Sequence, residues 1–291
     1  MSDYLACFFQ LTAWPMETPA AGSAFHILFA CTGILSAILA ALFLAGKKAV
    51  RPERLLFACG LLLALSELYK QGFLYFAVNG RRYNWWYFPF QLCSIPMYLC
   101  LVYPLAARRQ RKSLKHIAPI GRCKTQPPEA WSETTPAARI LATFLQDFGL
   151  LGGFMALAFP EGFLYPYWTL TLHGFLWHFL LIFLGVYCAS RRLSDFGEAG
   201  FARCLPLYLA CCLIATGINT AVQLTVYPDS YADMFYINCF FPSEQPVFSQ
   251  ISLALGNLWG HVAYLLASCL GAFFIHRGMA RIFRKCESDR K

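Results

Sequence analysis

An all-α polytopic membrane bundle is the fold class that this sequence predicts, on three observations. The chain is 58% hydrophobic and only 13% charged, whereas soluble domains average about 25% charged residues. Several uninterrupted apolar runs reach the roughly 20 residues that a helix needs to cross a bilayer. The Lys and Arg residues gather in alternate segments between these runs, as membrane orientation requires.

Seven apolar runs are predicted as transmembrane helices of a single domain that covers residues 1–291. Their approximate limits are 22–45, 54–78, 86–107, 138–159, 163–188, 204–226 and 249–275. The first run is expected to be retained as an anchor, because no basic segment and no small-residue cleavage site precede it. No internal repeat divides the chain.

The first three runs are bounded by charged or turn-forming residues. The first stops at a Gly-Lys-Lys sequence that begins a short basic segment. The second carries Glu67 and Lys70 within its apolar sequence and ends at an Asn-Gly turn. The third opens among aromatic residues and has Pro89 and Pro96 on either side of a Gln-Leu-Cys-Ser sequence. Because proline lacks a backbone donor, this helix is expected to start irregularly or to bend there.

The last four runs are separated by segments of contrasting charge. The segment 108–137 starts with basic residues, becomes rich in proline and glutamate, and is predicted as a cytoplasmic loop. The fourth run carries Asp147 and ends at a Pro-Glu-Gly turn. An Arg-containing segment follows the fifth run, whereas the segment 227–248 after the sixth run has no Lys or Arg. A basic tail follows the seventh run.

This charge alternation predicts the orientation of the chain. Segments rich in Lys and Arg favour the cytoplasmic side of a membrane. The basic segments follow the first, third and fifth runs, and the tail is basic as well. We therefore expect an outside N-terminus, seven spans and a cytoplasmic C-terminus, in the plasma membrane.

Composition also excludes several classes of protein. The net charge of +9 lies in short segments between apolar runs, so no soluble basic domain is expected and nucleic acid is not a predicted partner. Most of the 13 cysteines fall inside apolar runs, where they act as small apolar residues, and none has zinc-type spacing. No P-loop, dinucleotide fingerprint, nucleophile elbow or zinc helix occurs. Neither a metal nor a cofactor is expected.

Polar side chains converge on the outer half of the predicted membrane. With the orientation above and a rise of about 1.5 Å per residue, residues from five runs fall at similar depth. They are Glu67, Lys70, Gln91, Cys93, Ser94, His173, His178, Asn219, Gln223, Asn257 and His261. Such groups are costly in hydrocarbon and face a bundle interior or a water-filled cavity. A polar cavity open to the outer side is therefore predicted.

Each of these groups also has a structural interpretation. Glu67 and Lys70 share a helix face and can neutralise each other. Amides and histidines spaced four apart, in the sixth and seventh runs, can join helices by hydrogen bonds. His173 and His178 are about 140° apart around a helix, so one of them is expected to be structural. A lone Cys93 would be a buried thiol, unless a nearby histidine generates its thiolate.

A family resemblance adds to this interpretation. The sequence Pro89-Phe90-Gln91-Leu92-Cys93-Ser94-Ile95 is similar to the Leu-Pro-Leu-His-Leu-Cys motif of YwaF-like integral membrane proteins. Glu67, His178 and an Asn238-containing segment before the last run fit the same family over roughly residues 20–275. An animal branch is regarded as a phospholipid acyltransferase with the motif cysteine as nucleophile. The resemblance thus implies Cys93 as nucleophile and His178 as base.

One position departs from the family motif. The residue two before the cysteine is commonly histidine in the family, and here it is Gln91. Glutamine can form hydrogen bonds but cannot take a proton at ordinary pH. A Cys–His pairing through this position is therefore absent.

These residues are compatible with two functions. The first is a cysteine-dependent phospholipid acyltransferase or hydrolase, with Cys93 and His178 as catalytic residues and Asn219, Asn238 or Asn257 near the oxyanion. The alternative is a non-enzymatic transporter or sensor that binds a small solute or lipid in the same cavity. Membrane lipids are the expected partners. The predicted substrate-binding residues are Glu67, Lys70, Gln91, His173, Asn219, Gln223, Asn238, Asn257 and His261. The sequence leaves the substrate and the oligomeric state open.

Overall fold

The computed structural model of the protein describes residues 2–114 and 135–288 and shows an all-α bundle. Within these ranges, six helical segments are long and apolar enough to cross a membrane. The chain is thus a multi-pass membrane protein, as predicted. Most of the predicted cytoplasmic loop 108–137, and the last residues of the basic tail, lie outside the described residues.

The helices follow one another along the chain with few long connections. Their bounds are α1 Ser2–Leu11, α2 Ala24–Gly46, α3 Pro52–Phe73, α4 Ile95–Leu114, α5 Pro136–Phe144, α6 Leu150–Ala158, α7 Trp168–Ser190, α8 Glu198–Thr225, α9 Phe248–Leu255 and α10 Asn257–Ser288. Two π-helical turns extend them: η1 Leu74–Val78 continues α3, and η3 Leu145–Gly149 joins α5 to α6. The short turns η2 Trp85–Tyr87, η4 Pro160–Gly162 and η5 Met234–Tyr236 lie in the connections.

Six of the seven predicted spans correspond, in the described part of the chain, to helices that are long and apolar enough to cross a membrane, and the number of crossings stays a prediction. The run 86–107 does not form one long helix, because α4 begins only at Ile95 and its apolar part ends at Ala107. A helix of that length rises about 20 Å, short of the roughly 30 Å hydrocarbon core. The residues before Ile95 form a 3-10 turn and an irregular segment. Proline at Pro89 accounts for this irregular entry, since it cannot donate to a helical ladder.

The last predicted span, 249–275, is also interrupted. Gly256 adopts φ +96° and ψ 156°, and this conformation ends α9 and separates it from α10. Only glycine adopts this backbone region at low cost. α10 alone, through Phe283, is long enough to cross a membrane. The fifth predicted span starts late as well, at Trp168 instead of residue 163.

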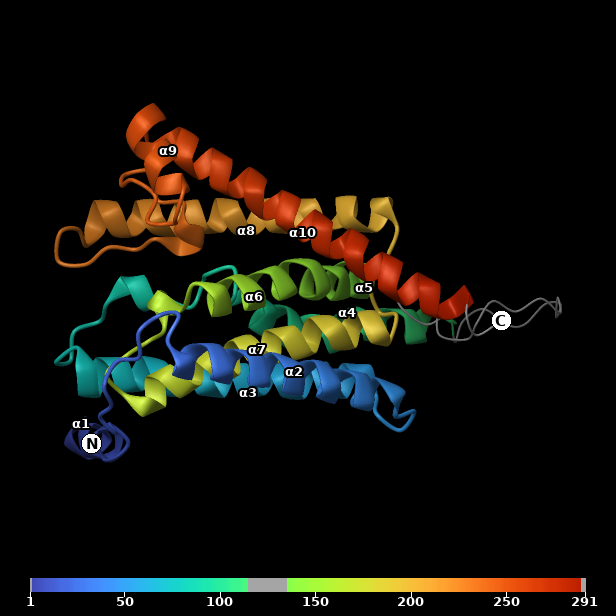
Figure 1. The fold of residues 1–291 in the computed structure, drawn as a ribbon, viewed down its shortest axis with the longest axis horizontal. Coiled ribbons are helices and arrows are strands. Elements are labelled where there is room, and N and C mark those ends of the chain that lie inside the picture. Colours follow the sequence, from blue (N-terminus) through green and yellow to red (C-terminus); the bar gives the residue numbers. More distant parts are fainter. Residues whose placement is uncertain (1, 115–134, 289–291) are drawn as a thin grey trace, which may run out of the picture.

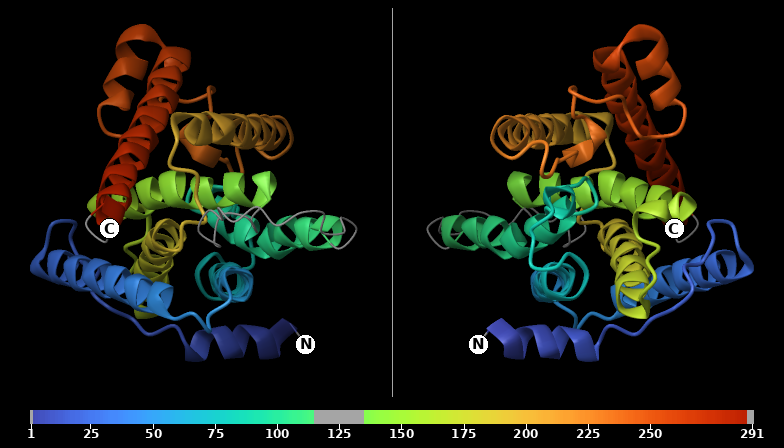
Figure 2. Two further views of the ribbon diagram at one scale, coloured as in Figure 1. Left: turned by 90° about the vertical axis from the view of Figure 1, so that its right-hand side faces the viewer. Right: turned by 90° about the vertical axis from the view of Figure 1, so that its left-hand side faces the viewer.

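α7 packs against α2, α3 and the α5–η3–α6 segment, and this segment lies between α7 and α8 (Figures 1 and 2). α7 and the α5–η3–α6 segment are the most buried of the candidate spans, whereas α2 and α10 are the most exposed. α2 and α6 pack against α7, α3 packs against α4, and α10 crosses over η3 and α6. This arrangement leaves apolar side chains of the outer helices exposed, as expected where lipid replaces water.

The connections fall into two groups at opposite ends of the long axis. In Figure 1, α1 and the segments around η2, η4 and η5 lie at one end. The α2–α3 and α7–α8 connections and the end of α10 lie at the other end. The second group carries the basic residues on which the predicted orientation depends. The orientation itself stays a prediction.

Candidate functional site

Cys93 lies in an irregular segment at the entrance to α4. The Ser94 N–H donates to Gln91 O at 2.8 Å and closes a turn around the cysteine. Tyr98 Oη donates to Pro89 O at 2.7 Å, and Trp177 Nε1 of α7 donates to Cys93 O at 3.0 Å. The carbonyls of Pro89 and Cys93 thus each accept a side-chain hydrogen bond. These bonds fix the position of the segment, although it is not helical.

Two adjacent glycines of α6 bring this turn close to α7. A Cβ on Gly152 would lie 3.7 Å from both Cα and Cβ of Cys93. A Cβ on Gly153 would lie 3.3 Å from the backbone oxygen of His178. α6 therefore contacts the cysteine turn at one glycine and the backbone of His178 at the next. Larger side chains at either position would separate these elements.

His178 presents one ring nitrogen that has no partner. Its Nδ1 donates to Gly174 O at 2.7 Å, and its ring stacks on Phe163 at 5.1 Å between centroids. Because a carbonyl can only accept, Nδ1 must carry the proton, and in neutral imidazole the lone pair is then on Nε2. Nε2 is buried without a hydrogen-bond partner in the part of the chain that the structure describes. This atom has the form of a general base.

The predicted pairing of Cys93 with His178 stays a prediction. Their elements are joined through Trp177, which precedes His178 and bonds the Cys93 backbone. No hydrogen bond joins the thiol to the imidazole among the described residues. His173, one turn before Trp177, also has a buried Nε2 without a partner there, and its ring lies 5.5 Å from that of Trp177.

Glu67 and Lys70 form an ion pair, as the structural interpretation of their spacing predicts. Glu67 is 4% exposed, and its Oε1 lies 2.8 Å from Lys70 Nζ. The same oxygen accepts from Gln71 Nε2 at 2.7 Å, and Gln71 Nε2 also donates to Tyr87 O at 2.6 Å. α3 is thereby attached to the aromatic turn before Cys93. Lys70 lies within electrostatic range of Cys93 and of both His173 and His178.

Gln91 and Asn219 hold the same short stretch of backbone from opposite elements. Gln91 Nε2 donates to Asp233 O at 2.8 Å, and its Oε1 accepts from the Phe235 N–H at 2.7 Å. Asn219 Nδ2 donates to Met234 O at 3.1 Å, and its Oδ1 accepts from the Met234 N–H at 2.7 Å. Each carboxamide thus makes both of the bonds that a backbone peptide would make in a β-ladder.

The stretch that they hold is strained. Phe235 and Tyr236 have φ values of 59° and 55°, in the left-handed region that costs about 1–3 kcal/mol for a residue other than glycine. Strain of this kind persists where surrounding contacts determine the conformation and is common at functional sites. Tyr236 lies within electrostatic range of Cys93, and its hydroxyl approaches Gly162.

Asn238 and Asn257 bind the same loop. Asn238 Nδ2 donates to Ala232 O at 2.6 Å, and its own N–H donates to Asp233 Oδ1 at 2.9 Å. Asn257 Nδ2 donates to Cys239 O at 3.2 Å. Four of the predicted binding residues therefore secure the backbone between residues 232 and 240. Their role in binding a substrate stays a prediction.

Half-buried Gln223 and buried His261 each carry buried polar atoms without a hydrogen bond. Gln223 Oε1 and both ring nitrogens of His261 have no partner in residues 2–114 and 135–288. His261 is only 2% exposed. Unpaired buried polar atoms are costly and mark places where a water or ligand binds. Both side chains therefore remain candidates for substrate binding.

Asp233 is a titratable group within this loop, outside the membrane-spanning helices. It is 5% exposed. Burial, together with the charge of Glu244, raises the pKa of Asp233 to about 6, although the bond from the Asn238 N–H opposes this. Its ionisation therefore falls close to physiological pH.

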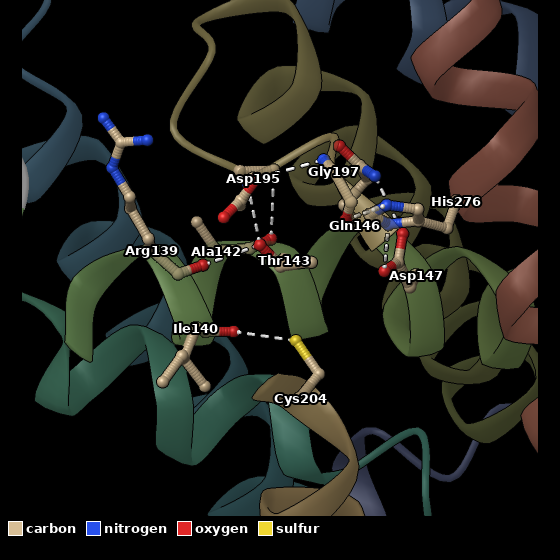
Figure 3. Close-up of polar contacts among 11 residues, drawn as sticks. Arg139, Ile140, Ala142, Thr143, Gln146, Asp147, Asp195, Gly197, Cys204 and His276 are labelled. Atoms are coloured by element: carbon tan, nitrogen blue, oxygen red, sulfur yellow. Dashed lines mark hydrogen bonds and ion pairs between the residues drawn. The ribbon is translucent and has the colours of Figure 1, made fainter. Parts of the chain in front are cut away.

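A second polar cluster, at the opposite end of the bundle, was missed as a pair at the level of sequence (Figure 3). His276 Nδ1 lies 2.8 Å from Asp147 Oδ2, and both side chains are fully buried. His276 Nε2 lies 3.1 Å from Gly197 O, and Gln146 Nε2 donates to Asp147 Oδ1 at 2.8 Å. Asp147 and His276 sit near the same end of two predicted spans, which is the signal that could have linked them.

No three His, Cys, Asp or Glu side chains gather as metal ligands in the part of the chain that the structure describes. The polar groups on the elements around the Cys93 turn are instead the Glu67–Lys70 ion pair, the imidazoles of His173 and His178, and tyrosine hydroxyls. This set suits proton transfer and charge stabilisation.

Comparison with known proteins gives one match. Residues 21–276 match the sequence model of the TMEM164 family, close to the range of roughly 20–275 expected for the family resemblance. The relationship to YwaF-like proteins stays an expectation. No curated protein and no solved structure matches the chain.

Proposed function

The chain belongs to the TMEM164 family of multi-pass membrane proteins, and we propose that it is a cysteine-dependent phospholipid acyltransferase. The observation that carries this proposal is the buried, unpartnered Nε2 of His178 on the helix whose preceding residue, Trp177, bonds the Cys93 turn. A plasma-membrane location and an outward-facing site are parts of the same proposal.

The proposed reaction has two steps. Cys93 Sγ attacks the ester carbonyl of a phospholipid, a C–S bond forms, and the ester C–O bond breaks. The lysophospholipid leaves with the thiol proton, which His178 transfers. In the second step the hydroxyl of an acceptor lipid attacks the thioester, and Cys93 regains its proton. If water is the acceptor, the same site is a hydrolase.

Two groups support charge stabilisation during these steps. The Lys70 ammonium, paired with Glu67 on α3, is the candidate cation for a thiolate or an oxyanion at Cys93, and it acts against the burial that disfavours the thiolate. Tyr236 is fixed by a strained loop near Cys93 and is the candidate donor to the oxyanion. Asn219, Asn238 and Asn257 each use one N–H of the side-chain amide to hold a backbone oxygen, which fixes these side chains in the loop, so we assign the oxyanion donor to Tyr236 instead.

The test is acyl transfer by purified protein in vesicles that contain a phospholipid donor and a lysophospholipid acceptor. Cys93→Ala should lower transfer by about a thousandfold or more, and His178→Ala by about 10²–10⁴-fold. Cys269→Ala is the matched control, since Cys269 is another half-buried thiol. Transfer that is unchanged in Cys93→Ala would overturn the proposal.

The alternative function gives a different result in the same preparation. A binder without chemistry tolerates Cys93→Ala and shows no change in lipid composition. In that case Glu67→Gln or His178→Ala should abolish thermal stabilisation by the ligand, because these groups would supply the ion-pairing contacts.

A further inference from the structure

A second site lies away from Cys93, between the first turns of α3 and the second half of α4. It is a cavity of about 430 Å³. Arg51, Glu53 and Arg54 supply its charged lining, and Phe57, Leu101 and Leu105 supply much of its apolar lining. A lining of this kind, charged at one helix end and apolar along the helices, matches the division of a lipid into headgroup and chain.

The packing of α3 on α4 explains why the cavity is there. A Cβ on Gly60 would lie 2.8 Å from Cys100 Cβ and 2.9 Å from the Leu101 nitrogen, so the two helices touch at this point. The cavity begins beyond the contact, toward the N-terminal end of α3. Phe57 is 44% exposed and Leu105 is 64% exposed. In a membrane-spanning chain, these side chains face lipid.

We propose that this cavity binds a phospholipid with a net negative headgroup. The Arg51 and Arg54 guanidinium groups hold the phosphate, and an acyl chain lies along Phe57, Leu101 and Leu105. This site is independent of the proposed acyl transfer.

The charges of the cavity select an anion. Two guanidinium groups outweigh the single carboxylate of Glu53, and no ion pair joins Arg51 or Arg54 to a carboxylate within residues 2–114 and 135–288. Guanidinium binds phosphate oxygens in pairs, with charge-assisted hydrogen bonds. α3 has no side-chain cap at its N-terminus, and its dipole also favours a negative group there.

The surrounding segment favours an acidic lipid over a zwitterionic one. Lys47 and Lys48 precede Arg51 in the same connection, so the positive potential extends around the cavity. A zwitterionic headgroup would bring its ammonium into this potential, whereas an acidic headgroup brings only negative charge. Basic residues at a membrane surface are attracted to anionic lipids.

The test is thermal unfolding of the purified protein in a neutral detergent, titrated with phosphatidylglycerol or with phosphatidylcholine of the same acyl chains. We expect phosphatidylglycerol to raise the midpoint temperature at a lower concentration than phosphatidylcholine. Equal effects of the two lipids would overturn the proposal. This comparison uses the unmodified chain, so it does not depend on the folding of a variant.

Paired variants locate the effect. Arg51→Gln with Arg54→Gln should raise the half-saturating lipid concentration about tenfold. The control variant, Lys47→Gln with Lys48→Gln, removes the same amount of charge from outside the cavity. It should change the half-saturating lipid concentration by less than about threefold. If both double variants lost lipid affinity equally, binding would depend on general surface charge, and the proposed site in the cavity would be overturned. If glycerol phosphate stabilised the protein as much as phosphatidylglycerol does, the ligand would be a free anion, and the proposal of a lipid would be overturned.

Discussion

At the scale of single residues, the hydrogen bonds of Gln91 give a structural reason for its departure from the family motif. Histidine is expected two positions before the cysteine, and glutamine stands there instead. The glutamine carboxamide reaches an acceptor and a donor of one backbone turn at η5, Asp233 O and the Phe235 N–H. The two nitrogens of an imidazole point in divergent directions and cannot make both bonds. Gln91 is therefore a positioning residue for the loop that carries Tyr236.

Removal of this clamp should destabilise the protein and lower acyl transfer. Gln91→Ala loses two hydrogen bonds, each worth about 0.5–1.5 kcal/mol, and leaves the Phe235 N–H without a partner. We expect a lower midpoint of thermal unfolding, and a lower kcat because Tyr236 is no longer fixed. Gln223→Ala is the matched control, since Gln223 Oε1 has no partner to lose among the described residues. Equal unfolding midpoints for the two variants would contradict the clamp.

Asp233 should make stability depend on pH. Its pKa in the folded protein is about 6, above the ordinary aspartate value of 3.8. The folded state therefore binds the proton more tightly than the unfolded state, and stability falls as pH rises through about 6. The full loss is at most about 3 kcal/mol. Asp233→Asn should remove this fall while keeping an acceptor for the Asn238 N–H. A midpoint that falls equally in both proteins between pH 4 and 6.5, by differential scanning fluorimetry, would refute the assignment.

At the scale of elements, the π-helical turn η3 places two polar residues inside the bundle. Gln146 and Asp147 are fully buried within it, and Asp147 meets His276 of α10. Both nitrogens of His276 face acceptors, a carboxylate and the Gly197 carbonyl. One proton therefore lies between Asp147 and His276, and the pair joins α10 to the α5–α6 segment and to the α7–α8 connection (Figure 3).

Removing both sides of this pair should cost less than the sum of removing each side alone. Either Asp147→Leu or His276→Phe leaves a buried polar partner unpaired, at about 3–5 kcal/mol. The double variant should lose less than the sum of the two single losses, with a coupling of about 1 kcal/mol or more. The measurement is a double-mutant cycle on unfolding in detergent. Additive losses would show that the two side chains do not interact.

The elements also show what the sequence could predict. Apolar length and charge alternation were enough to locate most helices, because a bilayer imposes both. They were not enough at the third and seventh runs, where Pro89 and Gly256 interrupt the helix without changing the hydropathy. Backbone geometry at single residues determines where these helices begin and end. Hydropathy averaged over about 20 residues does not detect such geometry.

At the scale of the whole molecule, the basic connections gather at one end of the bundle and the candidate site lies toward the other (Figure 1). Depth along the predicted spans brought Glu67 together with Lys70, and it placed Cys93 and His178 in one region. It could not show that the amides of Gln91, Asn219, Asn238 and Asn257 all bind one loop. Those bonds depend on the path of residues 232–240, which no periodicity in the sequence encodes.

The orientation follows from the same distribution of charge. We expect the N-terminus outside the cell and the C-terminus in the cytoplasm, because positive residues favour the cytoplasmic side. Reporter fusions that are active on only one side of the membrane should label the two termini oppositely. Proteins with both termini on the same side would contradict this prediction and exclude an odd number of crossings.

The central claim is that Cys93 carries an acyl group during the reaction, and intact-protein mass spectrometry tests it most directly. After incubation with a phospholipid and no acceptor, the protein should gain the mass of one fatty acyl chain. Neutral hydroxylamine should remove it, since it cleaves thioesters, and Cys93→Ala should never acquire it while Cys269→Ala does. An acyl adduct that persists in Cys93→Ala, or no adduct on the unmodified chain, would contradict the account.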